Sequence, residues 1–321
     1  MHKSEIDPKI LEQVRKLEEK YEAMGQDLSS YLDGLLYSDY TTYWDYIHLD
    51  TLLSLQTPKT GLEDEMVFII YHQQSELFFK LILWELEQVG RAEDISEAFF
   101  IKKIERVNRI LRQLSDSFSI MIEGLDKEQF LKFRTALLPA SGFQSAQYRL
   151  IEMTSTSLNN LIAADQRHLF KEEEDLEELL KHVYWKQAAI ELSSGKKTLT
   201  LEQFEEKYTD FFIFRAKAYR HKNIEAIFKE NFSKDNSQLV DLLKEFDYLA
   251  NVSWPLAHYK SAVKHLHKNE ADIAATGGTN WQKYLPPRFQ KIIFFPELWT
   301  ENEKKEWGKS WLLKEVLGKT D

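Results

Sequence analysis

The sequence contains no cysteine. Disulfide bonds, thiolate zinc sites, iron–sulfur clusters and cysteine-ligated haem all need that sulfur, so these classes are excluded. Positive charge is also in short supply: 42 Lys and Arg stand against 52 Asp and Glu, for a net charge of -10. Because such a surface repels nucleic-acid phosphates and anionic lipid head groups, we expect neither nucleic acid nor a membrane as a partner.

Long apolar runs are missing as well, and none approaches the length of a membrane-spanning helix. The opening residues, MHKSEIDPKILEQVRKLEEKYEAMG, are polar and charged, unlike the apolar stretch of a secretory signal. We therefore expect a cytoplasmic protein.

Glycine and proline are scarce, with 11 and 7 in 321 residues. Since sheets need frequent turns, this scarcity favours long helices, and we predict an all-α fold, a helical bundle in a single domain over residues 1–321. Capping pairs are predicted at Thr60 with Glu63, Asp126 with Gln129, and Thr200 with Gln203. Periodicity predicts helices over residues 8–23, 62–89, 96–122, 126–139, 144–161, 200–228 and 237–268, the last bent or interrupted near Pro255.

The segment FIIYHQQSELFFK, residues 68–80, places a histidine on an aromatic helix face. Phe68, His72 and Phe79 share one stripe of the predicted helix. A histidine among phenylalanines must find a hydrogen-bond partner. One interpretation is a core histidine satisfied by a neighbour. The other is a polar group at the bottom of an aromatic pocket, placed to accept a hydrogen bond from a ring N–H.

The segment FLKFRTALLPAS, residues 130–141, places an arginine on an apolar face. Phe130, Arg134 and Leu137 lie on one helical stripe. Because arginine keeps its charge, it needs an anion when it is buried. It either extends to solvent or into an internal salt bridge, or it holds a ligand carboxylate with both arms of its guanidinium.

The segment WPLAHYKSAVKHLH, residues 254–267, gathers His258, Ser261, Ala262 and His265 on one side of a helix. Small residues around a histidine leave room for a flat group, as a haem requires beside its axial ligand. An ordinary helix with surface histidines is the alternative. The pattern disfavours a zinc protease motif, because the neighbouring histidines are not at the i, i+4 spacing with an adjacent glutamate.

The segment ATGGTN, residues 275–280, contains a glycine pair that ends the helical region. Its amides and the Thr276 hydroxyl suit the polar head of a ligand, although Gly-Gly pairs also form ordinary turns. Taken together, these segments indicate a helical protein with an aromatic, cation-lined pocket. They do not identify a cofactor.

The chain resembles the tryptophan 2,3-dioxygenases over most of its length. Three long segments carry the resemblance: YWDYIHLDTLLSLQ, DEMVFIIYHQQSELFFKLILWEL and FRTALLPASGFQSAQYRLIE. The histidine helix, the TGG loop and FFPELW follow in the family's order. Several long motifs in one order are highly specific. The resemblance implies the all-α fold of that family, with the weakly matched residues 165–235 as a variable helical insertion.

The resemblance also assigns site residues. His258 matches the proximal haem ligand, and His72 matches the distal histidine that hydrogen-bonds the indole N–H. Arg134 matches the clamp for the substrate carboxylate, and Arg149 is a candidate partner of a haem propionate. The remaining pocket positions are Phe68, Phe130, Leu137, Ser141, Gly142 and Thr276. Tyr43, Tyr46 and Ile47 match residues that enter a neighbouring subunit's pocket, which implies a homotetramer.

The implied function is cleavage of the indole ring of L-tryptophan by O2, with haem b in the Fe(II) state, to give N-formylkynurenine. The sequence departs from the family pattern at Phe78, Pro255, Leu256 and Ala275. A related haem monooxygenase or dioxygenase acting on a substituted tryptophan or another aromatic amino acid would keep the same site residues. A haem or amino-acid sensor without turnover and a helical scaffold without cofactor are further alternatives.

Overall fold

The computed structural model describes residues 6–37, 41–136, 142–170, 175–187, 189–190, 195–265 and 285–309. Across these ranges the chain is helical and forms no strand, only isolated bridges at Ile162–Val183 and Ile190–Lys197. The predicted all-α class is therefore confirmed. The chain divides into two compact units, Met1–Thr57 and Pro58–Asp321, and each is described by itself. The single domain over residues 1–321 stays a prediction.

The first unit holds short helices without a core of their own. The Asp7 side chain accepts a hydrogen bond from the Lys9 amide and begins α1 at the predicted residue. The rings of Tyr21 and Tyr31 lie 4.5 Å apart and connect α1 to α2. No residue of 6–37 or 41–57 is buried. The helices of this unit are α1 (Pro8–Ala23), α2 (Leu28–Tyr37), α3 (Tyr43–Tyr46) and α4 (Leu49–Leu53).

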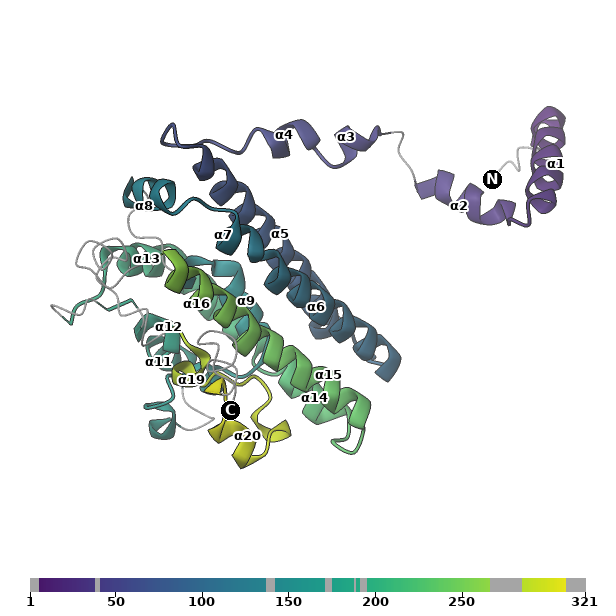
Figure 1. Cartoon of the computed structure of the whole chain (residues 1–321). Helices are drawn as coiled ribbons and strands as arrows, with labels where there is room; N and C mark the ends of the chain where they lie inside the picture. The colour runs from purple at the N-terminus through teal and green to yellow at the C-terminus, as the bar shows by residue number, and fades with distance from the viewer. Residues whose placement is uncertain are drawn as a thin grey trace. The chain divides into compact units, whose positions relative to one another are not determined.

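The second unit is built on two long helices, α5 (Glu63–Arg91) and α6 (Glu97–Ser117), which lie side by side (Figure 1). Apolar residues recur every three or four positions on both helices, which turns one stripe of each toward the other. Burying one such side chain contributes about 1.5–3 kcal/mol. The fully buried stripe of α6 consists of Phe100, Ile104, Val107, Leu111 and Leu114.

Further helices pack around this pair. Helix α9 (Ala146–Ser155) contacts α5, and α15 (Ser237–Tyr248) contacts α6. Over the described ranges, no helix is long and apolar enough to cross a membrane. The others are α7 (Ser119–Glu123), α8 (Lys127–Ala136), α10 (Leu158–Leu161), α11 (Leu176–Lys181), α12 (Tyr184–Gln187), α13 (Leu199–Tyr219), α14 (Ile224–Asn231), α16 (Trp254–His265), α19 (Pro287–Gln290) and α20 (Glu301–Lys305).

Two of the three predicted helix starts need correction. Helix α5 begins at Glu63, and its N-cap residue is Leu62. The Thr60 hydroxyl donates its hydrogen bond to Glu65 rather than to Glu63, and Glu65 also accepts from the backbone amides of Lys59 and Thr60. Helix α13 is capped by Thr198, two residues before the predicted Thr200. The third start is confirmed, because Asp126 accepts a hydrogen bond from the Gln129 amide.

Three predicted helices are each interrupted. Residues 96–122 form α6 and α7, which meet at Phe118. Residues 144–161 are divided at Thr156, whose backbone is extended. Its hydroxyl donates a hydrogen bond to the Phe294 carbonyl. Residues 200–228 are divided before Asn223, whose side chain caps α14. Local periodicity continues through each of these breaks, and at Thr156 and Asn223 the break coincides with a side-chain hydrogen bond.

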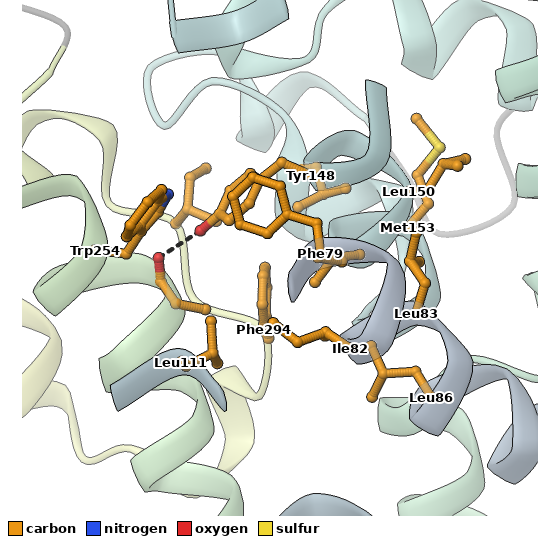
Figure 2. Close-up of a cluster of buried hydrophobic side chains, with 14 of the residues drawn as sticks. Phe79, Ile82, Leu83, Leu86, Leu111, Tyr148, Leu150, Met153, Trp254 and Phe294 are labelled. Carbon is orange, nitrogen blue, oxygen red and sulfur yellow. Dashed lines mark hydrogen bonds between the residues drawn. The ribbon is translucent and has the colours of Figure 1, made fainter. Parts of the chain in front are cut away.

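The predicted interruption near Pro255 is present as a π-helical turn, Leu249–Ser253, between α15 and α16. Proline has no N–H, and its ring collides with the carbonyl four residues earlier in a regular helix. A wider turn directly before Trp254 and Pro255 relieves that collision. The Tyr148 hydroxyl donates a 2.6 Å hydrogen bond to the Ala250 carbonyl in this turn (Figure 2).

The C-terminal segment is attached to α15 by one buried carboxylate. Asp247 accepts hydrogen bonds from the Phe294 and Phe295 amides at 2.8 and 3.1 Å, and from the Trp299 indole at 2.9 Å. Burial raises the pKa of Asp247 to about 6, against these donors. Asp247 therefore anchors the FFPELW sequence one π turn before the helix that carries His258.

Candidate active site

His258 lies on α16 within a cage of aromatic rings. The ring centroids of Phe118 and Trp254 are each 4.6 Å from the His258 centroid, and both rings stand edge-on to it. Behind Trp254 lies Phe79, at 5.6 Å (Figure 2). Burial and, to a smaller extent, the charge of His72 lower the pKa of His258 to about 4, against the Trp254 carbonyl. The imidazole is therefore neutral at pH 7, the form in which histidine ligates a metal.

His72 lies on α5 and is held in one tautomer. Its Nδ1 lies 2.7 Å from the Phe68 carbonyl. Because a carbonyl can only accept, Nδ1 carries the proton and Nε2 keeps its lone pair. Burial lowers the pKa of His72, opposed by the Phe68 carbonyl and by Glu76. The ring is thus a neutral acceptor, as the sequence interpretation of an aromatic pocket requires.

The two histidines are connected through aromatic rings. Tyr71 lies 5.9 Å from His72 and 5.5 Å from Phe118, and Phe118 lies 4.6 Å from His258. The charge of His72 also lowers the pKa of His258. The His72 side chain is exposed. The region between the two imidazoles is therefore a candidate ligand site.

Helix α8 brings the predicted arginine beside this space. The Arg134 guanidinium lies 5.4 Å from the centre of the Phe130 ring. Phe130 is buried and lies 6.2 Å from Phe68, so α5 and α8 share an aromatic wall. Arg134 is close enough to lower the pKa of His72, and burial lowers the pKa of Arg134 itself. Phe68, His72, Phe130 and Arg134 are thus brought together.

Arg149 belongs to a buried polar cluster, and its positive charge also lowers the pKa of His258. Arg149 on α9 donates to the Tyr184 hydroxyl at 3.2 Å and pairs with Glu152 at 3.2 Å. The Tyr184 hydroxyl donates to Glu152 at 2.6 Å. Burial raises the pKa of Glu152 to about 7, against Arg149 and Tyr184. Two buried donors, Arg149 Nε and Trp185 Nε1, have no hydrogen-bond partner among the described residues.

These features fit a haem. A neutral imidazole is available as the axial ligand, and Ala257 and Ala262 place small side chains beside it. The unpartnered Arg149 and Trp185 donors are suited to an anionic group such as a haem propionate. Within the described residues, no group of histidine, aspartate and glutamate side chains could hold a bare metal ion.

Some predicted residues fall outside the described part of the chain, namely Leu137, Ser141 and Thr276. Gly142 begins the short turn Gly142–Gln144 that leads into α9. Tyr43 and Tyr46 are 71% and 76% exposed on α3, and Ile47 directly follows that helix in the first unit. The structure does not relate these three residues to the site.

Sequence reasoning missed the residues that support the site from other helices. Phe118 and Trp254 beside His258, and Glu152 with Tyr184 beside Arg149, were not singled out. A signal existed for two of them: Trp254 precedes His258 by four residues and Glu152 follows Arg149 by three, and both spacings place side chains on one helix face. Phe118 and Tyr184 come from distant segments and left no local signal.

Comparison with known proteins decides the family. The model of the family described as "Tryptophan 2,3-dioxygenase" matches residues 35–278, which is more than half of the chain. The chain belongs to the tryptophan 2,3-dioxygenase family. It is therefore a member of a family of oxidoreductase enzymes, as the sequence motifs predicted.

Individual tryptophan 2,3-dioxygenases match either a part of the chain or most of it. The protein from Ruegeria sp. (strain TM1040) is 40% identical over 134 residues, which cover 41% of this chain and 48% of that protein. The protein from Ruegeria pomeroyi is 29% identical, covering 82% of this chain and 92% of its own length. The protein from Geobacillus thermodenitrificans is 28% identical with the same two shares.

Proposed function

We propose that this protein is a haem-dependent tryptophan 2,3-dioxygenase, which cleaves the C2–C3 bond of the indole of L-tryptophan with O2 and forms N-formylkynurenine. The observation that carries the proposal is that Phe68, His72 and Arg134 lie along one aromatic wall, and that His258 is close enough for the charge of His72 to lower its pKa. Family membership supports the reaction. Haem b, bound through His258, would supply the ferrous iron at which dioxygen is activated.

The chain's own residues would bind and orient the substrate. Arg134 holds the carboxylate through charge-assisted hydrogen bonds, and Phe130 beneath it supports the guanidinium. His72 accepts the indole N–H at Nε2, the nitrogen that its bond to Phe68 leaves unprotonated. Phe68 covers the indole from the α5 side. Fixing both ends of the amino acid holds C2 and C3 in one position and replaces a random encounter with an oriented one.

The desolvated surroundings of the site strengthen these contacts. Phe68, Phe130 and Phe133 form a continuous aromatic wall, with ring centroids 5.5 to 6.2 Å apart. A charge pair between Arg134 and a carboxylate is stronger in such a medium than in water. Leu137, Ser141 and Thr276 remain proposed pocket residues on the strength of the sequence motifs.

A homotetramer is the proposed assembly. The support is the first unit, in which helices with apolar stripes have no buried residue. Isolated short helices are marginal in water, and exposed apolar surface of this kind marks an interface. Tyr43, Tyr46 and Ile47 would reach the pocket of a neighbouring subunit. Replacing both tyrosines by alanine should weaken L-tryptophan binding, whereas unchanged binding would remove them from the pocket. A cytoplasmic location is also proposed.

An absorption spectrum tests the proposal directly. The reduced protein should show a haem Soret band that shifts when L-tryptophan is added without oxygen. Admitting air should then produce N-formylkynurenine. Colourless protein would exclude a haem enzyme, and haem binding with no turnover under reducing conditions would favour a sensor.

A further inference from the structure

A second histidine of α16 lies in the protein interior and has no role in the proposed reaction. His265 is the last residue of the helix, about two turns beyond His258, and is 1% exposed. Its Nε2 lies 2.9 Å from the Met121 carbonyl in α7. Since a carbonyl only accepts, Nε2 carries the proton and Nδ1 holds a lone pair. That Nδ1 is buried without a hydrogen-bond partner among the described residues.

The hydrogen bond of His265 serves a carbonyl that α7 leaves open. The last carbonyls of a helix have no amide partner within it, and Met121 stands near the end of α7. Burial lowers the pKa of His265, opposed by the Met121 carbonyl, while Lys264, Lys127 and Arg134 add to the lowering. The neutral ring thus joins α16 to α7 at a point where three positive charges lie nearby.

The same ring also packs against an aromatic residue beside the proposed amino-acid clamp, Arg134. The His265 ring centroid lies 5.0 Å from that of Phe130 on α8. Phe130 in turn carries the Arg134 guanidinium over its face at 5.4 Å. Phe130 and Arg134 are one helical turn apart, so a shift of the Phe130 ring moves the surface on which the guanidinium lies. His265 is therefore the link between the helix of His258 and the clamp.

We infer that His265 is a positioning residue for Arg134: hydrogen-bonded to Met121 and packed on Phe130, it fixes where the guanidinium meets the substrate carboxylate. This inference rests on the proposed function. A ligand that lacks a carboxylate does not use Arg134. His265 therefore contributes to the binding of L-tryptophan and not to that of tryptamine, which has the same indole and amine. General support of the fold would affect both ligands alike.

Variants of His265 separate these roles. His265→Leu keeps much of the volume and removes the donor to Met121. His265→Gln keeps a donor near the position of Nε2. His182→Leu is the matched control, because His182 is a half-buried histidine whose partners, Gln166 and Glu178, lie outside the site. The dissociation constants of L-tryptophan and tryptamine are measured from the Soret shift of reduced protein without oxygen, with haem content and thermal unfolding recorded for each variant.

The expected result is selective. His265→Leu raises the dissociation constant of L-tryptophan about tenfold, the size expected for one weakened charge-assisted contact, and changes that of tryptamine less than about twofold. His265→Gln restores most of the L-tryptophan affinity, and His182→Leu changes neither ligand. Equal losses for both ligands, or no loss for either, would overturn the inference. If His265→Leu fails to fold, the same comparison with His265→Asn, whose amide is too short to reach Met121, decides the question.

Failure of the proposed function gives a different result. If wild-type protein binds no haem, or shows no shift with L-tryptophan, the proposed site is wrong before any variant is compared. If wild-type protein binds both ligands and the His265 variants keep the wild-type ratio of the L-tryptophan and tryptamine dissociation constants, the proposed function is retained. The positioning role of His265 is then wrong.

Discussion

The two histidines of the site are held in opposite ways. His258 is half-buried beside the rings of Phe118 and Trp254, follows a π-helical turn, and has its pKa lowered to about 4. Among the described residues, His72 is hydrogen-bonded to the Phe68 carbonyl one turn earlier, and its side chain remains exposed. The difference fits a permanent ligand to a cofactor on α16 and reversible binding of a substrate on α5.

Removing the enclosed histidine should have the largest effect. His258→Ala deletes the proposed axial ligand. Among the described residues, no other histidine packs against both Phe118 and Trp254, so we expect the variant to be purified almost without haem. The ratio of Soret to protein absorbance measures the loss. His182→Ala, outside the site, should retain full haem content. Normal haem loading of His258→Ala would contradict the assignment of His258 as the axial ligand and would mean that another residue ligates the haem.

The clamp on the opposite side should control affinity rather than haem content. Arg134→Ala removes a charge-assisted contact and should weaken L-tryptophan binding by about 1.5–3 kcal/mol. Arg134→Lys keeps the charge without the planar fork and should lie between wild type and alanine. Soret titration of reduced protein without oxygen measures both. Unchanged affinity in Arg134→Ala would exclude this residue from the site.

The low pKa of the enclosed histidine should be visible in haem-free protein. The folded pKa of about 4 lies below the ordinary histidine pKa of 6.5, so the folded state favours the neutral ring. This contribution is complete above about pH 6.5 and is lost as pH falls toward 4. Between pH 8 and pH 5, wild-type apoprotein should lose roughly 1–2 kcal/mol more stability than His258→Ala in urea unfolding. Identical pH profiles for the two proteins would contradict the enclosure of His258.

The smallest effect is expected at the exposed histidine. His72→Phe removes one acceptor for the indole N–H, worth about 1 kcal/mol of substrate binding. Wild-type protein should prefer L-tryptophan over the analogue in which sulfur replaces the indole nitrogen. The variant should lose that preference while keeping its haem. A preference that survives in His72→Phe would show that another group reads the indole nitrogen.

A contrast between local and long-range contacts explains what the sequence could predict. Local pattern placed the bounds of α1 and most of α5, because caps and apolar spacing act within a few residues. It also predicted a break near Pro255, since proline disrupts a helix by itself. It did not predict the division at Thr156, whose hydroxyl bonds Phe294 across the fold.

The site divides along the same line. His72, Arg134 and His258 were each visible as an unusual side chain on a helix face, yet only the family motifs assigned them to one site. The proximity of His72 to His258 depends on how α5 packs against α16, which local periodicity does not encode. Phe118 and Tyr184 escaped for the same reason, because each meets its histidine or arginine partner from a separate segment.

The most direct test of a dioxygenase site between His258 and His72 is the fate of labelled oxygen. Reduced protein is given L-tryptophan under isotopically labelled O2, and the product is analysed by mass spectrometry. The account predicts N-formylkynurenine in which both inserted oxygen atoms carry the label. A product with a single labelled oxygen, or an intact indole ring, would contradict it.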